Sequence, residues 1–399
     1  MIKKSVLELL THVKREVGDM IEENPYGYID GIAKIAGKIE KSRKYRIKDY
    51  EEVINQLTNE ELALYKSDSS EEGIIKGSQL LETCKKVISK AKEYRREKNK
   101  KTNRVETNLL THAPYFVGGS KKRKAQGKKE GYIKIDKDGL RKMTYQNNLG
   151  HMLTMADAKA LIALFSLWEE QDYGEWVTFT EYQIVNRLDM GMGGNQYQLV
   201  RNSLEKLRNT SVVFQEAYEI ETGKRVKTER FDLIIADEST IEYNKSGEVN
   251  SKQFRFQFSP HIEKSFNHGY YTFISIAVFN ELEIEAAQAL YVMISGIASM
   301  ENASEYIKED GVFVIPLEEV YGTLFLEDRR PKNKGTVEKG CEELKSIDII
   351  KEYTFIKEGR AFTKLEIEIT DWLKDVLGKK DYIGSGGGRI KQLTFNDMA

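Results

Sequence analysis

The sequence has 399 residues, enough for two or three domains of ordinary size, and 40% of them are hydrophobic. A net charge of −1 excludes a globally basic nucleic-acid-binding protein, so any case for nucleic acid must depend on where the charges lie. The only two cysteines, Cys84 and Cys341, exclude a disulfide framework and a cysteine zinc site, and they fit a reducing compartment.

Residues 1–100 are predicted to form a mainly helical N-terminal region whose role the sequence does not indicate. Apolar residues between Val6 and Val17 recur at helical spacing, and further helical runs cover about Tyr50–Tyr65 and Ser78–Asn99. The first run is too charged to be a secretory signal. No apolar run in the chain approaches the roughly 20 residues of a membrane-spanning helix. We therefore expect a soluble, cytoplasmic protein.

Residues 101–149 are predicted to be a basic linker. Two stretches at this point of the chain, KEYRREKNKKTNR (92–104) and GGSKKRKAQGKK (118–129), are dense in positive charge. A run of like charges repels itself and resists folding alone. Two interpretations remain open: a solvated hinge, or a basic arm that binds phosphates.

Residues 150–280 are predicted to form a first winged-helix domain. The helix MADAKALIALFSLWEEQ and the strand WVTF come first, and a Thr-x-x-Gln capping box at Thr180–Gln183 begins a second helix. A Gly-rich turn and a third helix from Asn195 follow. The strands SVVFQEAYEI and RFDLIIADEST, joined through ETGKRVKTE, are predicted to form a hairpin, and QFRFQFS a further strand. Helix, strand, helix, turn, helix and hairpin is the order of a winged helix.

Residues 281–378 repeat this order, which predicts a second winged-helix domain. The two third helices align without gaps, so that Val200, Leu204 and Leu207 match Val337, Cys341 and Leu344 on one buried stripe. The same alignment matches Val212-Val213 with Ile349-Ile350. The predicted fold class is therefore α+β, with two tandem winged-helix domains after a helical region, and with a flexible Gly-rich tail at 379–399.

The third helix of the first domain is the predicted base-contacting element. With its apolar stripe turned inward, amides and cations face outward: Asn195, Gln198, Arg201, Asn202 and Lys206. Amide side chains can bond adenine and arginine can bond guanine in the major groove. The alternative is that this polar face is only solvated.

The second domain carries cations suited to the phosphate backbone. They lie before and along its third helix: Arg329, Arg330, Lys332, Lys334 and Lys339. The predicted wing tips are also basic, with Lys224, Arg225 and Lys227 in the first domain and Lys357 and Arg360 in the second. Lys and Arg clusters bind phosphate but specify little sequence. Alternatively, these charges keep exposed loops soluble.

Catalytic motifs are missing from the sequence. There is no Gly-x4-Gly-Lys-Ser/Thr phosphate loop, no Gly-x-Ser-x-Gly elbow, and the five histidines never stand at metal-ligand spacing. The His-x-His pair that would accompany a DNA-nicking tyrosine is also missing. We therefore expect no enzymatic activity, no metal and no cofactor.

Over residues 150–375 the sequence resembles plasmid-type replication initiators with tandem winged helices. The stretch that carries the resemblance runs from the helix at 155–171 to the strand after Thr210, with a Gly-rich turn (Gly191, Gly193, Gly194), Tyr197 and a Leu204-x-x-Leu207 core. The resemblance implies a protein that binds repeated origin sites as monomer or homodimer, helps to open an AT-rich segment, and recruits the host helicase or its loader. Plasmid, phage and chromosomal origins stay open.

Three other functions compete with initiation. The first is a winged-helix transcriptional repressor, which uses the same DNA-binding units without a role in replication. The second is a nuclease or nicking enzyme, which would relax supercoiled DNA in the presence of a divalent metal. The third is an architectural or partner-binding protein that docks through its helical N-terminal region.

Overall fold

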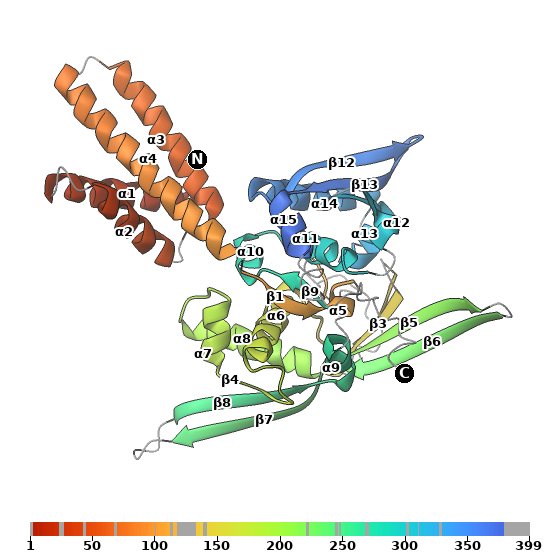
Figure 1. Ribbon diagram of the computed structural model, residues 1–399. Helices are drawn as coiled ribbons and strands as arrows, with labels where there is room; N and C mark the ends of the chain where they lie inside the picture. The colour runs from red at the N-terminus through yellow and green to blue at the C-terminus, as the bar shows by residue number, and fades with distance from the viewer. Residues whose placement is uncertain are drawn as a thin grey trace, which may run out of the picture. The chain divides into compact units, whose positions relative to one another are not determined.

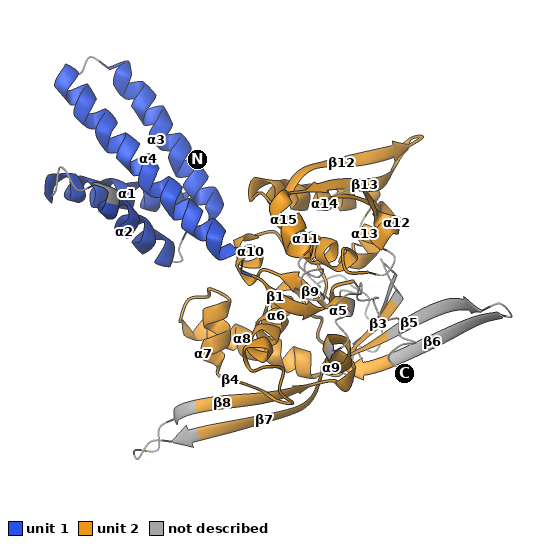
Figure 2. Cartoon of the chain, in the orientation of Figure 1, with its two compact units in different colours: residues 1–101 blue, residues 102–399 orange. Residues whose placement is uncertain are grey.

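The computed structural model describes residues 3–23, 28–42, 45–67, 70–99, 101–111, 115–117, 133–138, 142–220, 223–243, 246, 249–267, 271–300, 303–309, 311–326 and 329–378 (Figure 1). The side chains of residues 214–220 and 223–229 are not described. The chain divides into two compact units, residues 1–101 and 102–399 (Figure 2). The fold is mixed, with helices around small antiparallel sheets of two, three and four strands.

The N-terminal unit is helical. Its apolar core includes Tyr50, Val53 and Val87, all fully buried, together with the predicted apolar positions from Val6 to Val17. A helix that the sequence pattern did not predict follows the break at residues 24–27. The helices described in this unit are α1 (Lys4–Glu23), α2 (Tyr28–Lys41), α3 (Ile47–Tyr65) and α4 (Glu71–Asn99).

The segment predicted to be a linker contributes secondary structure to the second unit, and this differs from the expectation. Strand β1 (Asn103–Glu106) pairs with β9 (Tyr271–Ile274), and β3 (Lys142–Asn147) pairs with both β2 (Ile133–Asp138) and β5 (Thr210–Ile220). Helix α5 (Thr107–Thr111) contributes buried Leu109 and Leu110 to the core. Strands β1 and β3 have partners far along the chain, in β9 and β5, so local composition did not reveal them. The basic stretch at 118–129 lies outside the described residues.

Residues 155–267 form a first series of elements. A three-stranded sheet in the order β4–β8–β7 belongs to it, whereas β5 and β6 lie in a separate sheet in the order β2–β3–β5–β6. In chain order the elements are α6 (Met155–Glu170), β4 (Val177–Phe179), α7 (Glu181–Arg187), α8 (Gly194–Arg208), β5, β6 (Gly223–Asp232), β7 (Ile234–Tyr243), β8 (Val249–Phe258) and α9 (Pro260–Asn267).

Residues 285–378 form a second series with the same order. Its sheet follows the order β10–β11–β13–β12. Within this sheet, the order β11–β13–β12 corresponds to β4–β8–β7 in the first series. Helix α10 (Ile276–Glu281) precedes it. The elements are α11 (Glu285–Ile297), α12 (Ala303–Tyr306), β10 (Ile307–Glu309), β11 (Val312–Pro316), α13 (Leu317–Leu324), α14 (Arg330–Ser346), β12 (Ile350–Glu358), β13 (Ala361–Ile369) and α15 (Asp371–Gly378).

The two hairpins β7–β8 and β12–β13 share a detail of register. Each has an irregularity directly after its first residue pair, which is Ile234–Phe258 in one hairpin and Ile350–Ile369 in the other. A β-bulge inserts one extra residue and sharpens the local twist. The two series thus share a strand order and a register shift at the same position of the hairpin, and we refer to them below as the first and second copies.

One predicted correspondence between the copies is wrong. Val212-Val213 lie in β5, in the sheet formed with β3 and β6, rather than at the start of the hairpin that pairs with β4. Leu233-Ile234 take the place of Ile349-Ile350: the amide of Ser259 donates to the Leu233 carbonyl (3.4 Å), as the amide of Thr370 donates to the Ile349 carbonyl (3.2 Å). Residues 210–232 are therefore an inserted hairpin, and it belongs to a different sheet from the hairpin β7–β8 (Figure 1).

The matched positions on the third helices are buried as predicted. Val200, Leu204 and Leu207 are at most 4% exposed on α8, and Val337, Cys341 and Leu344 are fully buried on α14. Among the described residues, none of the helices combines the length and the apolar character needed to cross a membrane. Within the same ranges, no three His, Cys, Asp or Glu side chains gather where they could hold a metal ion.

Candidate nucleic-acid interface

The short helix α7, which has a capping box at its N-terminus, precedes α8 in the chain. The Thr180 hydroxyl accepts a hydrogen bond from the Gln183 amide (3.3 Å), and the Gln183 side chain accepts one from the Thr180 amide (2.8 Å), so the predicted capping box is present. After α7 the chain turns through Asp189, which has a positive φ of 50°, and α8 begins with Gly193 as its N-cap. The apolar stripe of α8 then faces the core and leaves the opposite side exposed.

The exposed side of α8 carries the predicted amides. Asn195, Gln198 and Asn202 are all exposed, and the Gln198 amide donates to the Asn202 carbonyl oxygen (2.9 Å). This bond holds two side chains one helical turn apart in a common orientation. Together they present both donors and acceptors outward, which is the combination that an adenine edge requires.

Arg201 lies beside these amides, and it has a partner that the sequence did not predict. Its Nε and Nη2 donate to the two carboxylate oxygens of Glu181, at 2.7 and 2.8 Å. Glu181 is the first residue of α7 and its side chain is only 9% exposed, whereas that of Arg201 is 49% exposed. The hydrogen bond to Glu181 raises the pKa of the Arg201 guanidinium further above its ordinary value.

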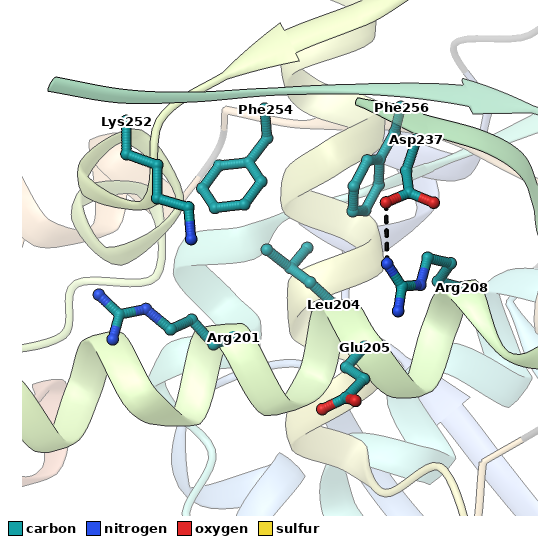
Figure 3. Close-up of a pocket in the computed structure, with 8 residues that line it drawn as sticks. All are labelled: Arg201, Leu204, Glu205, Arg208, Asp237, Lys252, Phe254 and Phe256. Carbon is teal, nitrogen blue, oxygen red and sulfur yellow. Dashed lines mark hydrogen bonds and ion pairs between the residues drawn. The ribbon is translucent and has the colours of Figure 1, made fainter. Parts of the chain in front are cut away.

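A hollow of about 230 Å³ lies between α8 and the hairpin β7–β8 (Figure 3). Arg208 closes one end through an ion pair with Asp237 (2.9 Å), and the Lys252 ammonium lies 4.7 Å from the Phe254 ring centre. The sequence analysis did not predict Arg208 or Lys252. The spacing of Arg201, Glu205 and Arg208 places these three residues along one side of α8 and could have indicated Arg208, whereas Lys252 lies on β8 and has no such local signal. The lining residues are Arg201, Leu204, Glu205, Arg208, Asp237, Lys252, Phe254 and Phe256.

The structure gives Lys206 a structural role in place of the predicted contact with DNA. Its ammonium lies 3.0 Å from a carboxylate oxygen of Asp157, which is fully buried. The same carboxylate accepts hydrogen bonds from the Ser203 hydroxyl (2.6 Å) and the Thr154 amide (2.6 Å). Lys206 therefore ties α8 to the start of α6, and we assign it no base contact.

In the second copy a carboxylate also accepts hydrogen bonds from backbone amides at the start of the first helix. There the carboxylate comes from Glu343 on α14, at the position that corresponds to Lys206, and it accepts from the amides of Glu283 and Ile284 (both 2.8 Å). Ile284 is the N-cap of α11, as Thr154 is of α6. In both copies a carboxylate satisfies the free amide before the first helix, and the third helix holds it there.

The cations of the second copy do not share one environment. Arg329, Lys332 and Lys339 are exposed around the first half of α14, and Arg330 is paired with Glu318 (2.8 Å). Arg329 is the N-cap residue of this helix. An exposed group of this kind can approach a phosphate backbone without breaking a buried contact.

Lys334 differs from its neighbours because it packs against the hairpin. Its ammonium lies 4.1 Å from the ring centre of Phe355 and 4.9 Å from that of Phe362, and 3.3 Å from Glu338. The Lys357 ammonium also lies over the Phe362 ring, at 4.8 Å from its centre. Arg360 is exposed in the turn of the hairpin, beside Gly359 with its positive φ. Lys334 thus joins α14 to the hairpin through cation–π contacts, whereas the contact of Lys357 links β12 to β13 within the hairpin.

The structure corrects the position of the predicted first wing. The hairpin that pairs with β4 is β7–β8, so the hairpin β5–β6, which carries Lys224, Arg225 and Lys227, is the insertion. Long-range pairing decides between two hairpins of similar strand pattern, and the sequence alone could not. The side chains of Lys224, Arg225 and Lys227 lie outside the described part of the chain.

Comparison with known proteins gives structural matches only. A scan against protein-family models finds no match, and a search of curated proteins finds none. A crystal structure of selenomethionine derivatives of domains 2 and 3 of RctB matches with a TM-score of 0.45 and 13% identity, over 66% of this chain and 97% of that one. A second structure of RctB domains 2–3 matches with a TM-score of 0.43 and 13% identity, over 67% and 99%.

A third match is a crystal structure of Pi initiator protein in complex with iteron DNA. Its TM-score is 0.36 and its identity 14%, over 54% of this chain and 91% of that one. TM-scores as low as these, at such identities, establish neither a common fold nor a common function.

Proposed function

We propose that the two series of elements are tandem winged-helix units, and that the chain is a sequence-specific binder of duplex DNA that initiates replication. The observation that carries the proposal is the repeated strand order, β4–β8–β7 and β11–β13–β12, with an exposed polar helix beside each hairpin. A helix of this kind with an adjacent hairpin fits the major groove and the flanking backbone.

The two units divide the work between base edges and phosphates. Helix α8 contacts bases through Asn195, Gln198, Arg201 and Asn202, whose amides and guanidinium suit adenine and guanine. Helix α14 and the hairpin β12–β13 hold the backbone through exposed lysine and arginine side chains. Affinity falls steeply with salt, because each neutralised phosphate releases counterions. Lys224, Arg225 and Lys227 on the inserted hairpin remain candidate phosphate contacts.

Initiation is preferred to repression because of the resemblance of residues 150–375 to plasmid-type initiators. On this proposal the protein binds repeated sites at an origin, as monomer or homodimer, in the cytoplasm. It uses binding energy to promote opening of the duplex and to recruit the host helicase or its loader. It acts without catalysis of its own and without a cofactor.

Two measurements test the proposal in sequence. The full chain is mixed with fragments of the DNA that surrounds its gene, and bound fragments are recovered and footprinted; we expect protection of iterated repeats. Failure to bind any duplex at low salt would contradict the DNA-binding function. The gene and the protected repeats are then placed on a plasmid without an origin. Maintenance of that plasmid supports initiation, whereas binding without maintenance supports the repressor.

A further inference from the structure

Among the residues that the structure describes, the hydrogen bonds of the Arg201 guanidinium lie along one edge only. Glu181 takes Nε and Nη2 in a parallel fork, at 2.7 and 2.8 Å. Arginine has five N–H groups in a fixed plane, so the edge formed by Nη1 and the second Nη2 hydrogen points away from this carboxylate. Guanine presents O6 and N7 side by side in the major groove, and that pair of acceptors matches the remaining edge.

Glu181 is well suited to hold Arg201 in place. It begins α7 directly after the N-cap Thr180, and its side chain is 9% exposed, so the carboxylate has little freedom to move. Arg201 is half exposed on α8, where an unsupported arginine would sample many rotamers. We infer that Glu181 is a positioning residue that fixes the guanidinium plane of Arg201 for contact with one guanine, and this inference rests on the proposed function.

For affinity to the cognate site, a positioning role of Glu181 and simple charge repulsion by Glu181 predict opposite effects of neutralising this residue. A carboxylate near DNA repels phosphates, so its neutralisation should strengthen binding to every duplex. If Glu181 positions Arg201, neutralising it should instead weaken binding to the cognate site while binding to random duplex stays the same or strengthens. The ratio of the two affinities therefore separates the two effects.

The experiment compares Glu181→Gln with Glu205→Gln in the full chain. Glu205 is an exposed carboxylate on α8 that lines the same hollow, so its substitution removes an equal charge close to Arg201. Dissociation constants are measured for a footprinted site and for a random duplex at one salt concentration. We expect Glu181→Gln to lower the cognate-to-random ratio roughly tenfold, as loss of a bidentate base contact does, and Glu205→Gln to leave it unchanged. An unchanged ratio in Glu181→Gln would overturn the inference.

A double variant separates positioning from a general effect on α7. In an Arg201→Ala background, Glu181→Gln should cause no further loss of the ratio, because its effect passes through Arg201. A further loss in that background would show a structural effect and overturn the inference. Methylation interference gives an independent signature: N7 methylation of one guanine should weaken binding by the parent protein but not by Glu181→Gln or Arg201→Ala.

The failures of the two proposals differ. If Arg201→Ala lowers the ratio and Glu181→Gln does not, only the positioning role is lost. If Arg201→Ala weakens cognate and random duplex equally, Arg201 contacts no base, and base recognition by this residue fails together with the inference. If no duplex is bound at all, the DNA-binding function itself fails.

Discussion

Lys206 shows at the scale of a single residue how a surface cation can serve the fold. Its ammonium neutralises Asp157, a fully buried carboxylate that also caps the start of α6. Lys206→Met should therefore destabilise the second unit by about 1–3 kcal/mol, because it leaves that charge without its cation. Denaturant unfolding followed by tryptophan fluorescence reports this unit, since the three tryptophans (Trp168, Trp176 and Trp372) all lie in it.

Lys339→Met is the matched control for this substitution. Lys339 is exposed on α14, so its replacement should change the unfolding free energy by less than about 0.5 kcal/mol. Where both variants are folded, Lys206→Met should keep the cognate-to-random affinity ratio of the parent protein. A lowered ratio in the folded Lys206→Met protein would restore Lys206 to the DNA-binding surface.

At the scale of elements, α14 contains two glycines with opposite environments. A Cβ at Gly340 would lie 2.9 Å from Leu290 Cδ1 and 3.1 Å from the backbone of Ala286, both on α11, whereas at Gly335 it would meet nothing within 4 Å. Gly340→Ala should cost about 1–3 kcal/mol, because α11 and α14 cannot pack as closely. Gly335→Ala should add about 0.5–1 kcal/mol of stability through helix propensity. Thermal unfolding of the pair in parallel checks both signs, and equal shifts would contradict the close packing.

The inserted hairpin β5–β6 offers a second prediction for an element. Residues 216–227 can be replaced by an Asn-Gly turn after the pair Gln215–Thr228, which keeps the register of the remaining strands. The fold should survive, because the pairs from Ser211–Asp232 to Gln215–Thr228 and the pairing of β5 with β3 are retained. Circular dichroism and the unfolding midpoint measure this, and loss of cooperative unfolding would refute it.

The same shortened protein tests the tip of the inserted hairpin as a phosphate contact. The removed residues carry three acidic side chains (Glu216, Glu219, Glu221) and three basic ones (Lys224, Arg225, Lys227), so net charge is preserved. A change in the slope of log affinity against log salt then reports lost contacts rather than lost charge. We expect a slope smaller by up to about 3, one for each basic residue that binds phosphate. An unchanged slope would remove this tip from the interface.

The elements also show what the sequence could predict and why it stopped there. Helical periodicity identified the buried stripes from Val200 to Leu207 and from Val337 to Leu344, because spacing along one helix is a local property. It could not say that Leu233-Ile234, rather than Val212-Val213, stand at the start of the hairpin that pairs with β4, since that depends on long-range strand pairing. For the same reason the pairing of Arg201 with Glu181, 20 residues away in the chain, was not visible.

At the scale of the whole molecule, the two compact units have separate apolar cores. One core lies within residues 1–101 and includes Tyr50 and Val87, and the other includes Val105, Leu110 and Tyr145. A chain of residues 102–399 should therefore fold alone and protect the same DNA repeats with the affinity of the full protein. Quantitative footprinting with both proteins measures the protected repeats and the affinities, and loss of the footprint would place DNA contacts in the N-terminal unit.

A further truncation decides whether residues 101–149 act as a linker or as part of the fold. A chain of residues 150–399 lacks β1, α5, β2 and β3, so within the described part of the chain β9 loses the strand that pairs with it and β5 keeps β6 but loses β3. It also lacks the buried side chains of Val105, Leu110 and Tyr145, and each large apolar side chain lost from a core costs about 2–5 kcal/mol. Because that sum approaches the whole stability of a typical domain, we expect this chain to lose cooperative unfolding and to aggregate, whereas 102–399 does not. Equal stability of the two truncated chains would show that the segment is a linker after all.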